Sequence, residues 1–486
     1  MTNLCLACLS LLVVAAAAAR AQAPLTAVPV AATASPAAAV PAGPRTNVIF
    51  VLADDLGFGE LGCFGNKNVK TPNLDRLAAE GIKFNHFYVN SPICSPSRVA
   101  FTTGQHPSRW NVTSYIDDRA ANRKRGMADV LDPKAPSLAR VLQSAGYRTA
   151  HVGKWHMGGG RDVGDAPLIS KYGFDMSLTQ FEGLGDRLLP TFDTLFPNQE
   201  HHAHPLANHS AKLGRGNVDF VKRHTVTGRF VQHAMAFIRA AQEANQPFYV
   251  NVWPDDVHTP LEPSPEARGD GVMAMYKGVL EELDRDLGQL FEFVRSDSKL
   301  RQNTIIIFAS DNGHDAVITP AASLRGHKAT LYEGGIRTPL IVWWPAGQEA
   351  AKVGSVNDST VIAGYDLPPT VLDFADIPVP AGITFDGQNM TDAFRGGDRK
   401  RSGTLCWMRP PDRPGPKGEF PDLAIRRGQW KLLIEENGTD EQLYDLDADP
   451  TESKNLAREN PTIVKDLTAQ LMTWRKSMPQ PMSGQP

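Results

Sequence analysis

The chain has 486 residues, and its 50 Lys and Arg against 53 Asp and Glu give a formal net charge of -3. This length allows two or three domains, or one large α/β domain with an appendage. The near balance of charge, without a long block of one sign, excludes the footprint of a nucleic-acid-binding or membrane-surface protein. The composition therefore predicts a small-molecule or uncharged-surface partner, unless a few placed cations hold an anion locally.

Residues 1–23 are predicted to form a signal peptide. A short apolar stretch leads to Ala21, Gln22 and Ala23, which match the small-x-small pattern of a cleavage site. A transmembrane anchor is the alternative, but the apolar run is short for a bilayer and Arg20 interrupts it. Residues 24–44 are rich in Ala and Pro and predict a flexible linker. We therefore expect a periplasmic or extracellular protein with no transmembrane anchor after signal cleavage.

Cleavage of the predicted signal peptide would leave three of the five cysteines, namely Cys63, Cys94 and Cys406. An odd number of cysteines in an oxidising compartment leaves at least one thiol unpaired. Cys94 is the candidate for this thiol. Cys63 and Cys406 could form a disulfide, although the sequence alone does not show that they meet.

Short apolar runs predict the strands of a sheet, at residues 47–53, 148–152, 248–253, 303–309 and 339–344. Their nearly continuous apolar character is typical of strands covered on both faces in a parallel sheet. Helical patterns lie between them: one begins at Thr71 and Pro72 and stops at Gly81, and another begins at Ser137 and stops at Gly146. Alternating strands and helices predict an α/β fold.

Chemically functional side chains follow four of the predicted strands: Asp54 and Asp55; Lys154 and His156; Asp255, Asp256 and His258; Asp311 and Asn312. Ligands of open α/β sheets bind outside the carboxyl ends of the strands, so we expect these groups to converge on one edge. Each motif alone is more often a turn or a surface segment. Their common position after successive strands favours a functional site.

An all-oxygen set of candidate metal ligands is offered by Asp54, Asp55, Asp311 and Asn312. Such a set favours a hard divalent cation, Ca²⁺ before Mg²⁺, over zinc. The histidines then remain available for proton transfer. Positive charge is available at Arg98, Lys154 and Lys328, which suits an anionic substrate group bound at the metal.

Cys94 directly precedes Ser-Pro-Ser-Arg and a run that predicts a helix. A cysteine at the start of a helix would have a lowered pKa and could be a nucleophile activated by a nearby histidine. The alternative is a buried, inert thiol, which is the commoner fate of an isolated cysteine. Neither interpretation explains the spacing of Pro96 and Arg98 or the candidate metal ligands.

The segment from Cys94 to Arg98, read as C-x-P-S-R, resembles the signature of formylglycine-dependent type I sulfatases of the alkaline phosphatase superfamily. In that family the cysteine is oxidised to formylglycine. Further segments are similar to the family's two metal strands, its Lys/His segment, its second lysine segment and its C-terminal subdomain: residues 48–66, 310–313, 146–158, 326–345 and 423–457. The resemblance covers almost the whole chain after the predicted signal peptide.

The resemblance implies an alkaline-phosphatase-like α/β fold, with a large mixed, mainly parallel sheet sandwiched by helices and a smaller C-terminal antiparallel sheet plus helix. We place the catalytic α/β domain at residues 45–394 and the C-terminal α+β subdomain at 395–486, where the pattern changes. A loop at residues 411–418 is predicted to reach the mouth of the active site. The His-rich segment 196–220 predicts a solvated loop beside the substrate pocket rather than a second metal site.

The resemblance also implies a role for each candidate residue. Calcium would be held by Asp54, Asp55, Asp311 and Asn312, with the modified Cys94 completing the shell. Arg98 would fix the formylglycine and help its ionisation, and His156 would contact the formylglycine diol. Lys154 and Lys328 would hold sulfate oxygens, and His258 would act as the general acid at the leaving oxygen.

The implied activity is hydrolysis of sulfate esters, which makes the protein a sulfuric ester hydrolase, with sulfated polysaccharides or oligosaccharides as the preferred substrates. One hydroxyl of the hydrated aldehyde would attack sulfur, and loss of a proton from the other would release sulfate. A formylglycine-generating enzyme or an anaerobic sulfatase-maturing enzyme is the expected maturation partner. Two alternatives stay open: a formylglycine-dependent phosphodiesterase or phosphonate monoester hydrolase, and an inactive carbohydrate-binding relative.

Overall fold

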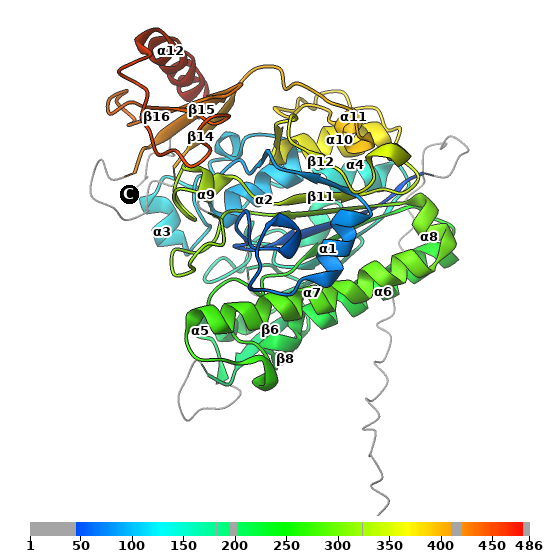
Figure 1. Ribbon diagram of the computed structural model, residues 1–486. Coiled ribbons are helices and arrows are strands. Elements are labelled where there is room, and N and C mark those ends of the chain that lie inside the picture. The colour runs from blue at the N-terminus through cyan, green and yellow to red at the C-terminus, as the bar shows by residue number, and fades with distance from the viewer. Residues whose placement is uncertain (1–44, 181, 195–201, 323, 410–419, 480–486) are drawn as a thin grey trace, which may run out of the picture. The chain divides into compact units, whose positions relative to one another are not determined.

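A central sheet organises the fold in the computed structural model, which describes residues 45–180, 182–194, 202–322, 324–409 and 420–479 (Figure 1). Within these residues the sheet has 11 strands in the order β12-β2-β11-β10-β1-β9-β4-β5-β6-β7, with β8 paired to β6. The predicted signal peptide, the predicted linker and the loop at 411–418 lie outside the described residues. The described residues all belong to one compact unit.

Four neighbouring strands at the middle of this sheet are those that the sequence predicts to be followed by functional side chains. They are β10 (Thr304–Ser310), β1 (Asn47–Ala53), β9 (Phe248–Trp253) and β4 (Arg148–Gly153). All three pairings among them are parallel. Nearly every residue of these strands is buried, as expected for apolar runs covered on both faces. Their carboxyl ends therefore open on the same edge of the sheet.

The fifth predicted strand, β11 (Leu340–Trp343), runs antiparallel to β10 and to β2 (Ile82–Phe84). Its apolar run predicted that the strand is buried, which is correct, but it did not predict the direction of the strand. A strand buried on both faces can run parallel or antiparallel to its neighbours. The sheet is thus mixed and mainly parallel, as predicted. Its remaining strands are β5 (Met176–Thr179), β6 (Asp186–Phe192), β7 (His202–Ala203), β8 (Val218–Lys222) and β12 (Val356–Asn357), while β3 (Phe87–Tyr88) pairs separately with β13 (Ile362–Ala363).

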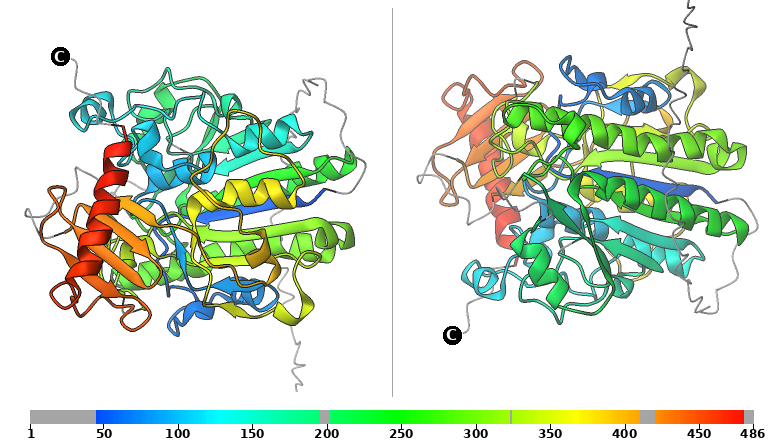
Figure 2. Two further views of the ribbon diagram at one scale, coloured as in Figure 1. Left: turned by 90° about the horizontal axis from the view of Figure 1, so that it is seen from above. Right: turned by 90° about the horizontal axis from the view of Figure 1, so that it is seen from below.

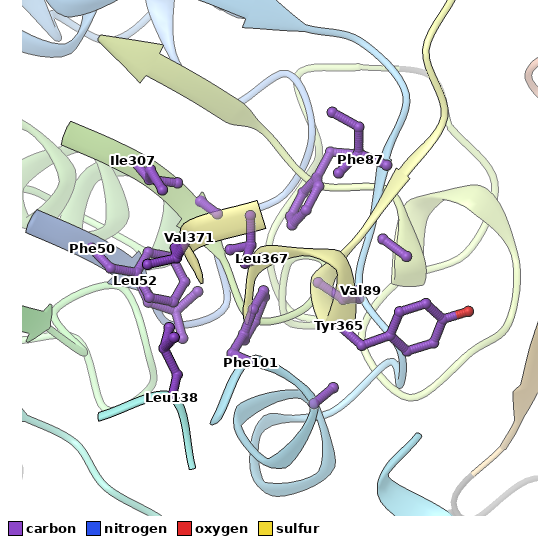
Figure 3. Packing of buried hydrophobic residues seen from close by; sticks show 14 of the residues in the cluster. Phe50, Leu52, Phe87, Val89, Phe101, Leu138, Ile307, Tyr365, Leu367 and Val371 are labelled. Carbon is purple, nitrogen blue, oxygen red and sulfur yellow. The ribbon is translucent and has the colours of Figure 1, made fainter. Parts of the chain in front are cut away.

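Helices cover both faces of the sheet (Figure 2). Along β1, Ile49 and Val51 face the cluster formed with α1 (Pro72–Ala79), α6 (Val226–Glu243) and α7 (Val272–Ser296). Phe50 and Leu52 face the opposite cluster, formed with α2 (Cys94–Thr103), α4 (Leu138–Ser144) and α10 (Leu367–Phe374) (Figure 3). Each strand side chain therefore removes apolar area from water on one face or the other, worth roughly 25 cal/mol per Å².

The other helices are short: α3 (Arg119–Lys124), α5 (Pro205–Lys212), α8 (Ser298–Asn303), α9 (Glu333–Ile336) and α11 (Thr391–Arg395). Single 3-10 turns lie at Gly62–Phe64, Pro107–Trp110, Ile169–Tyr172, Arg223–Thr225, Pro265–Ala267, Ala350–Lys352 and Gly364–Asp366. In the described part of the chain, no helix has the length and apolar character needed to cross a lipid bilayer.

The two helix starts predicted from sequence are correct in position. Helix α1 begins after Thr71 and α4 begins after Ser137, but neither side chain makes a capping hydrogen bond. The Thr71 hydroxyl instead binds Gly62 N and Asp75, and the Ser137 hydroxyl donates to Tyr172 O. Tertiary partners have replaced the local cap in both cases.

The C-terminal segment forms the predicted antiparallel sheet and helix. Its strands are β14 (Leu405–Met408), β15 (Leu423–Arg427), β16 (Trp430–Ile434) and β17 (Gln442–Asp445), in that order across the sheet. Leu467 and Leu471 of α12 (Pro461–Ser477) pack on the apolar face of β15 and β16. The domain boundary at residue 394 falls inside α11 and stays a prediction.

A buried ion cluster joins β16 to the start of α9, at Glu333. Lys431 Nζ lies 2.9 Å from Glu333 Oε1 and 2.8 Å from Glu452 Oε1, and all three side chains are inaccessible to solvent. Replacing Lys431 with Met is expected to lower the free energy of unfolding by about 3–5 kcal/mol, because it leaves Glu333 and Glu452 buried without the Lys431 ammonium. Denaturant unfolding would measure the loss.

The matched control for this prediction is Lys454→Met, which removes an exposed pair with Glu459 and should leave the free energy of unfolding almost unchanged. The loss in Lys431→Met should also shrink at lower pH, because a protonated carboxyl needs no cation. Equal unfolding midpoints for the two variants at neutral pH would contradict the prediction.

Candidate active site

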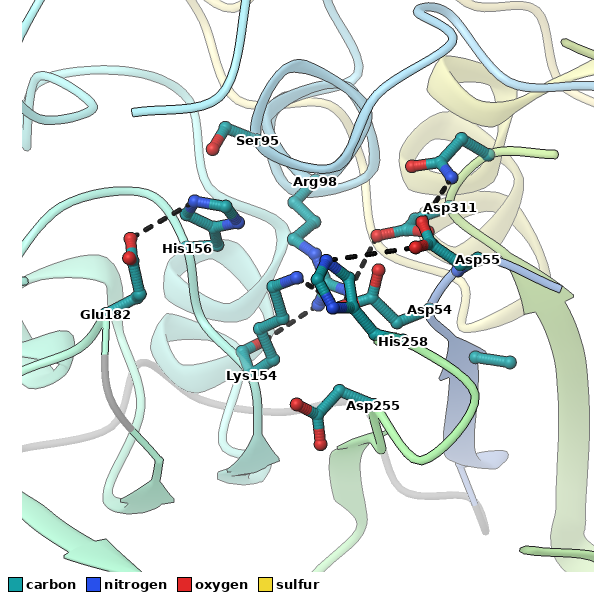
Figure 4. A network of polar contacts seen from close by, with 12 residues as sticks. Asp54, Asp55, Ser95, Arg98, Lys154, His156, Glu182, Asp255, His258 and Asp311 are labelled. Atoms are coloured by element: carbon teal, nitrogen blue, oxygen red, sulfur yellow. Dashed lines mark hydrogen bonds and ion pairs between the residues drawn. The ribbon is translucent and has the colours of Figure 1, made fainter. Parts of the chain in front are cut away.

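The carboxyl ends of β10, β1, β9 and β4 bring the predicted site residues together, as Figure 4 shows. The register pairs Ala53 with Ser310, so Asp54 and Asp311 leave adjacent strands side by side. Asp311 N donates to Ala53 O at 3.1 Å, which fixes the two chain ends together. The convergence expected from the sequence is therefore present in the fold.

The predicted metal ligands are fully buried and contact one another. Asp55 N donates to Asp311 Oδ1 at 3.2 Å, and Asn312 Nδ2 donates to Asp55 Oδ1 at 2.7 Å. Ligand atoms of Asp54, Asp55, Cys94 and His258 all lie within 4.8 Å of one another. Asp311 is not in that group; its carboxylate pairs with Arg98, whose NH2 lies 2.7 Å from Asp311 Oδ2.

Two oxygen atoms in this cluster test whether a cation fits. Asp54 Oδ1 and Asn312 Oδ1 are buried and lack a hydrogen-bond partner among the described residues. An orphaned buried acceptor costs about 1–3 kcal/mol, so such atoms in a native site call for an ion or water. Carboxylate and amide oxygens are the donors that Ca²⁺ and Mg²⁺ prefer. The residues present fit a hard divalent cation.

The two aspartates Asp54 and Asp311 have opposite pKa shifts. Burial and the nearby Asp54 carboxylate raise the pKa of Asp311 to about 7. Burial would also raise the pKa of Asp54, but Lys154, His258 and Arg98 hold it well below its usual range. Asp54 is therefore ionised, while Asp311 is more readily protonated. A bound cation would favour the ionised form of both carboxylates.

Three cations surround these carboxylates. Lys154 Nζ binds Asp54, and Lys328 Nζ lies 2.7 Å from Asp55. Burial would lower the pKa of each lysine, but these carboxylates raise it above its ordinary value, so both remain charged. Arg98, on α2, is wholly buried and donates to Lys154 O at 2.8 Å. Positive charge therefore lies directly at the predicted anion site.

Cys94 is the first residue of α2, and only 2% of it is exposed. Its predicted lowered pKa is wrong: burial raises the pKa of the thiol to about 12, and the nearby lysines offset this only in part. The position at the helix start was read correctly from sequence, but burial outweighs the favourable end of the helix dipole. An unmodified Cys94 would therefore be a poor thiolate nucleophile.

The two candidate histidines lie on different sides of the site. His258 Nδ1 lies 2.6 Å from Thr259 O, which can only accept, and His258 Nε2 lies 3.8 Å from Asp55. Burial and Lys328 lower the pKa of His258. His156 Nε2 lies 3.1 Å from Glu182 Oε2, and burial lowers the pKa of His156 to about 4. Both rings line the pocket described next.

A pocket of about 560 Å³ opens above Cys94, Lys154 and Lys328. The segment 196–220, predicted to form a wall of the substrate pocket, contributes His204 and Leu206 to the lining, and Phe192 of β6 also lines it. His204 accepts a hydrogen bond from Leu206 N at the start of α5, so it supports the helix. Arg409 and Phe420, which flank the loop at 411–418, also line the pocket.

Sequence patterns assigned the strand-end residue Asp256 to the site, but its carboxylate accepts from Thr227 of α6 instead. Its neighbour Asp255 does line the pocket and is held by Arg223, with NH1 at 2.8 Å from Asp255 Oδ1. Glu182 and Arg161 were missed altogether. They lie on loops without a motif, so no sequence signal marks them.

The fold and the site belong to a known class. Residues 46–377 match the family model described as "Sulfatase", and residues 326–477 match "N-sulphoglucosamine sulphohydrolase, C-terminal". The chain therefore belongs to the sulfatase family, with the alkaline-phosphatase-like fold. It is a sulfuric ester hydrolase.

Two curated sulfatases and one solved structure are similar to this chain over most of its length. The N-acetylgalactosamine-6-O-sulfatase of Bacteroides thetaiotaomicron is 29% identical, over 87% of this chain and 92% of its own length. The N-acetylgalactosamine-6-sulfatase of Homo sapiens is 31% identical over 71% of this chain, but only 65% of its own length is matched. The solved structure of Ps i-CgsB in complex with k-i-k-neocarrahexaose has a TM-score of 0.72 and 25% identity, over 90% of this chain and 94% of that one.

Proposed function

We propose that this sulfatase removes sulfate from sulfated polysaccharides or oligosaccharides, using a formylglycine made from Cys94 and a bound Ca²⁺, with Mg²⁺ as the weaker choice. The observation that carries the proposal is that ligand atoms of Asp54, Asp55 and Cys94 lie within 4.8 Å of one another, and that Cys94 lines the pocket. The C-x-P-S-R spacing around Cys94 supplies the modification motif. The family as a whole uses these two groups.

The metal would be held by Asp54, Asp55, Asp311, Asn312 and the modified residue 94. A divalent cation there would make a hydroxyl on residue 94 more acidic and would stabilise negative charge on a sulfate oxygen. In this structure the Cys94 sulfur stands for the hydroxyl oxygen of the modified residue 94. Arg98 would orient residue 94 and balance the carboxylates, because its guanidinium contacts both Asp54 and Asp311.

The lysines and His258 would act on the substrate. Lys154 pairs with Asp54, Lys328 pairs with Asp55, and both lysines line the pocket, so both can donate to sulfate oxygens. His258 keeps its Nδ1 hydrogen on Thr259 O, which leaves Nε2 to deliver a proton to the leaving oxygen. A bound sulfate would oppose the effect of Lys328 and favour the protonated ring.

The substrate class is argued from the pocket and the relatives. A pocket of about 560 Å³ falls within the range of roughly 300–1,000 Å³ typical of small-ligand sites. The names of the bacterial and human relatives make 6-O-sulfated N-acetylgalactosamine the first substrate to test, and carrageenan oligosaccharides the second. Matched phosphate diesters belong in the same screen, because lysines beside a metal also hold phosphate.

Export and maturation complete the proposal. The signal-peptide pattern of residues 1–23 supports a periplasmic or extracellular location. Formation of formylglycine requires a formylglycine-generating or anaerobic sulfatase-maturing enzyme as a transient partner. The balanced charge of the chain supports a carbohydrate partner rather than nucleic acid.

Mass spectrometry of the peptide that carries Cys94, from protein made in its native host, tests the proposal most directly. We expect the mass of formylglycine in place of cysteine, together with reaction of that peptide with an aldehyde-specific probe. Peptides with Cys63 and Cys406 are internal controls and should keep their thiols, since all three cysteines in the described part of the chain are unpaired, so the disulfide considered for Cys63 and Cys406 is not formed there. Active protein with only an unmodified Cys94 would disprove the mechanism.

A further inference from the structure

A carboxylate that the sequence did not mark lies against His156. Glu182 Oε2 is 3.1 Å from His156 Nε2, and His156 N donates to Glu182 O at 3.0 Å (Figure 4). Only 8% of the His156 side chain and 2% of the Glu182 side chain are exposed. His156 is thus bound to Glu182 through both its imidazole ring and its backbone N–H.

The carboxylate of Glu182 is itself held in place. Arg161 NH2 lies 3.2 Å from Glu182 Oε1, and Arg161 Nε lies 2.7 Å from Asp117 Oδ1. A guanidinium only donates, so it keeps an oxygen of residue 182 directed toward itself. The second oxygen then faces His156.

The backbone around this contact is also specialised. His156 has φ 54° and Glu182 has φ 77°, both in the left-handed region that costs a side-chain-bearing residue about 1–2 kcal/mol. A Cβ at Gly160 would come within 3.1 Å of Glu182 Cα, so glycine there permits the close approach. Strain of this kind persists where the surroundings fix it, and it is concentrated at functional sites.

These contacts determine where the ring carries its hydrogen. The atoms near His156 Nε2 are the Glu182 carboxylate and, at 3.3 Å, Ile116 O, and both can only accept. Nε2 must therefore donate, and a neutral ring then has its lone pair on Nδ1. Nδ1 is buried, has no hydrogen-bond partner among the described residues, and points away from Glu182 (Figure 4).

We propose that Glu182 is a positioning residue of this sulfatase, which fixes His156 as the Nε2–H tautomer so that the buried Nδ1 keeps a free lone pair. The proposal rests on the proposed function and on the contact between His156 and the formylglycine diol that the family resemblance implies; His156 and Cys94 line the same pocket. Nδ1 can then accept a proton from a hydroxyl of the modified residue 94. Glu182 touches His156 and not the reacting atoms, so its effect on the rate passes through the ring.

The variant Glu182→Gln tests this with almost no change in shape. Arg161 carries only N–H donors, so the amide oxygen is expected to face Arg161 and the amide NH₂ to face His156. Residue 182 lies closer to Nε2 than Ile116 O does, at 3.1 Å against 3.3 Å, so we expect Nε2 to accept from the amide and the hydrogen to move to Nδ1. We expect kcat to fall about 10- to 100-fold, the usual effect of losing a supporting carboxylate, with KM little changed. Glu182→Asp keeps a carboxylate and should recover part of the rate.

Nitrogen NMR of histidine-labelled protein reports the tautomer directly, and it works on the unmodified thiol form. The chain has 13 histidines, and the His156 signals are identified by their absence in His156→Gln. We expect Nε2–H in the parent protein and Nδ1–H in Glu182→Gln. Glu60→Gln is the matched control: Glu60 is buried, accepts from Ala321 N and lies outside the pocket lining, so neither tautomer nor rate should change.

An unchanged tautomer in Glu182→Gln would overturn the proposal, and so would a switched tautomer with an unchanged kcat. Failure of the proposed function looks different: the matured parent protein would then not release sulfate from any tested saccharide, while the NMR result would still decide what Glu182 does to the ring. A loss of rate without a tautomer change would show a purely structural role for Glu182.

Discussion

Cys94→Ala is expected to lower sulfate release at least about 10⁴-fold, the scale seen when a nucleophile is removed from an enzyme. Cys94 lines the pocket and lies within 4.8 Å of ligand atoms of Asp54 and Asp55, and among the described residues no other cysteine lines the pocket. An alanine there has no group that can attack sulfur. Rates measured on a sulfated saccharide, with protein coexpressed with the maturation enzyme, give the result.

Cys63→Ala is the control for this variant, because Cys63 lies on the short turn at Gly62–Phe64 and should be dispensable for turnover. Cys94→Ser, made without any maturation enzyme, sharpens the test. A serine hydroxyl can displace the alcohol from sulfur, but it has no second hydroxyl for releasing sulfate. We therefore expect a stable serine sulfate by mass spectrometry and no multiple turnover. Full activity of Cys94→Ala would disprove the role of residue 94.

Removal of divalent cations is expected to abolish activity, with recovery in Ca²⁺ and a weaker recovery in Mg²⁺. The physical reason is the buried set of oxygen donors, of which Asp54 Oδ1 and Asn312 Oδ1 have no other partner in the described residues. Ca²⁺ at 100 times its Kd should also raise the free energy of unfolding by about 2.7 kcal/mol. Calorimetric titration and thermal unfolding, with and without chelator, measure both effects.

Asp54→Asn should remove most of the Ca²⁺ affinity, because it replaces a charged ligand at the centre of the cluster. Asp447→Asn changes an exposed carboxylate of the C-terminal segment and should leave Ca²⁺ binding as it is. Zinc restoring activity better than calcium would contradict the assignment of a hard cation. Equal Ca²⁺ affinity in Asp54→Asn and the parent protein would place the metal elsewhere.

The strands and their functional ends were predictable because each signal is local. Continuous apolar runs identified β1, β4, β9 and β10, and the polar residues that follow them could be read directly from the chain. Parallel pairing then places all four ends on one edge. The direction of β11 was not predictable, since its burial does not depend on whether it runs with or against β10.

The chemical state of the site required the tertiary structure. Helix position suggested a lowered pKa for Cys94, but burial raises it, and burial depends on segments far away in sequence. Asp255 and Asp256 are adjacent in sequence, yet one lines the pocket and the other turns to α6. The contact between Glu182 and His156 joins two loops, and the loop that carries Glu182 has no motif that marks it in the sequence.

The sequence by itself determined the fold class, the family and the set of residues able to carry the chemistry, because hydrophobic pattern and motif spacing are properties of short segments. The tertiary structure decided which carboxylate faces which cation, how deeply Cys94 is buried, and which loops form the pocket wall. These depend on distances between segments that are far apart along the chain, and electrostatic and desolvation energies change steeply with those distances.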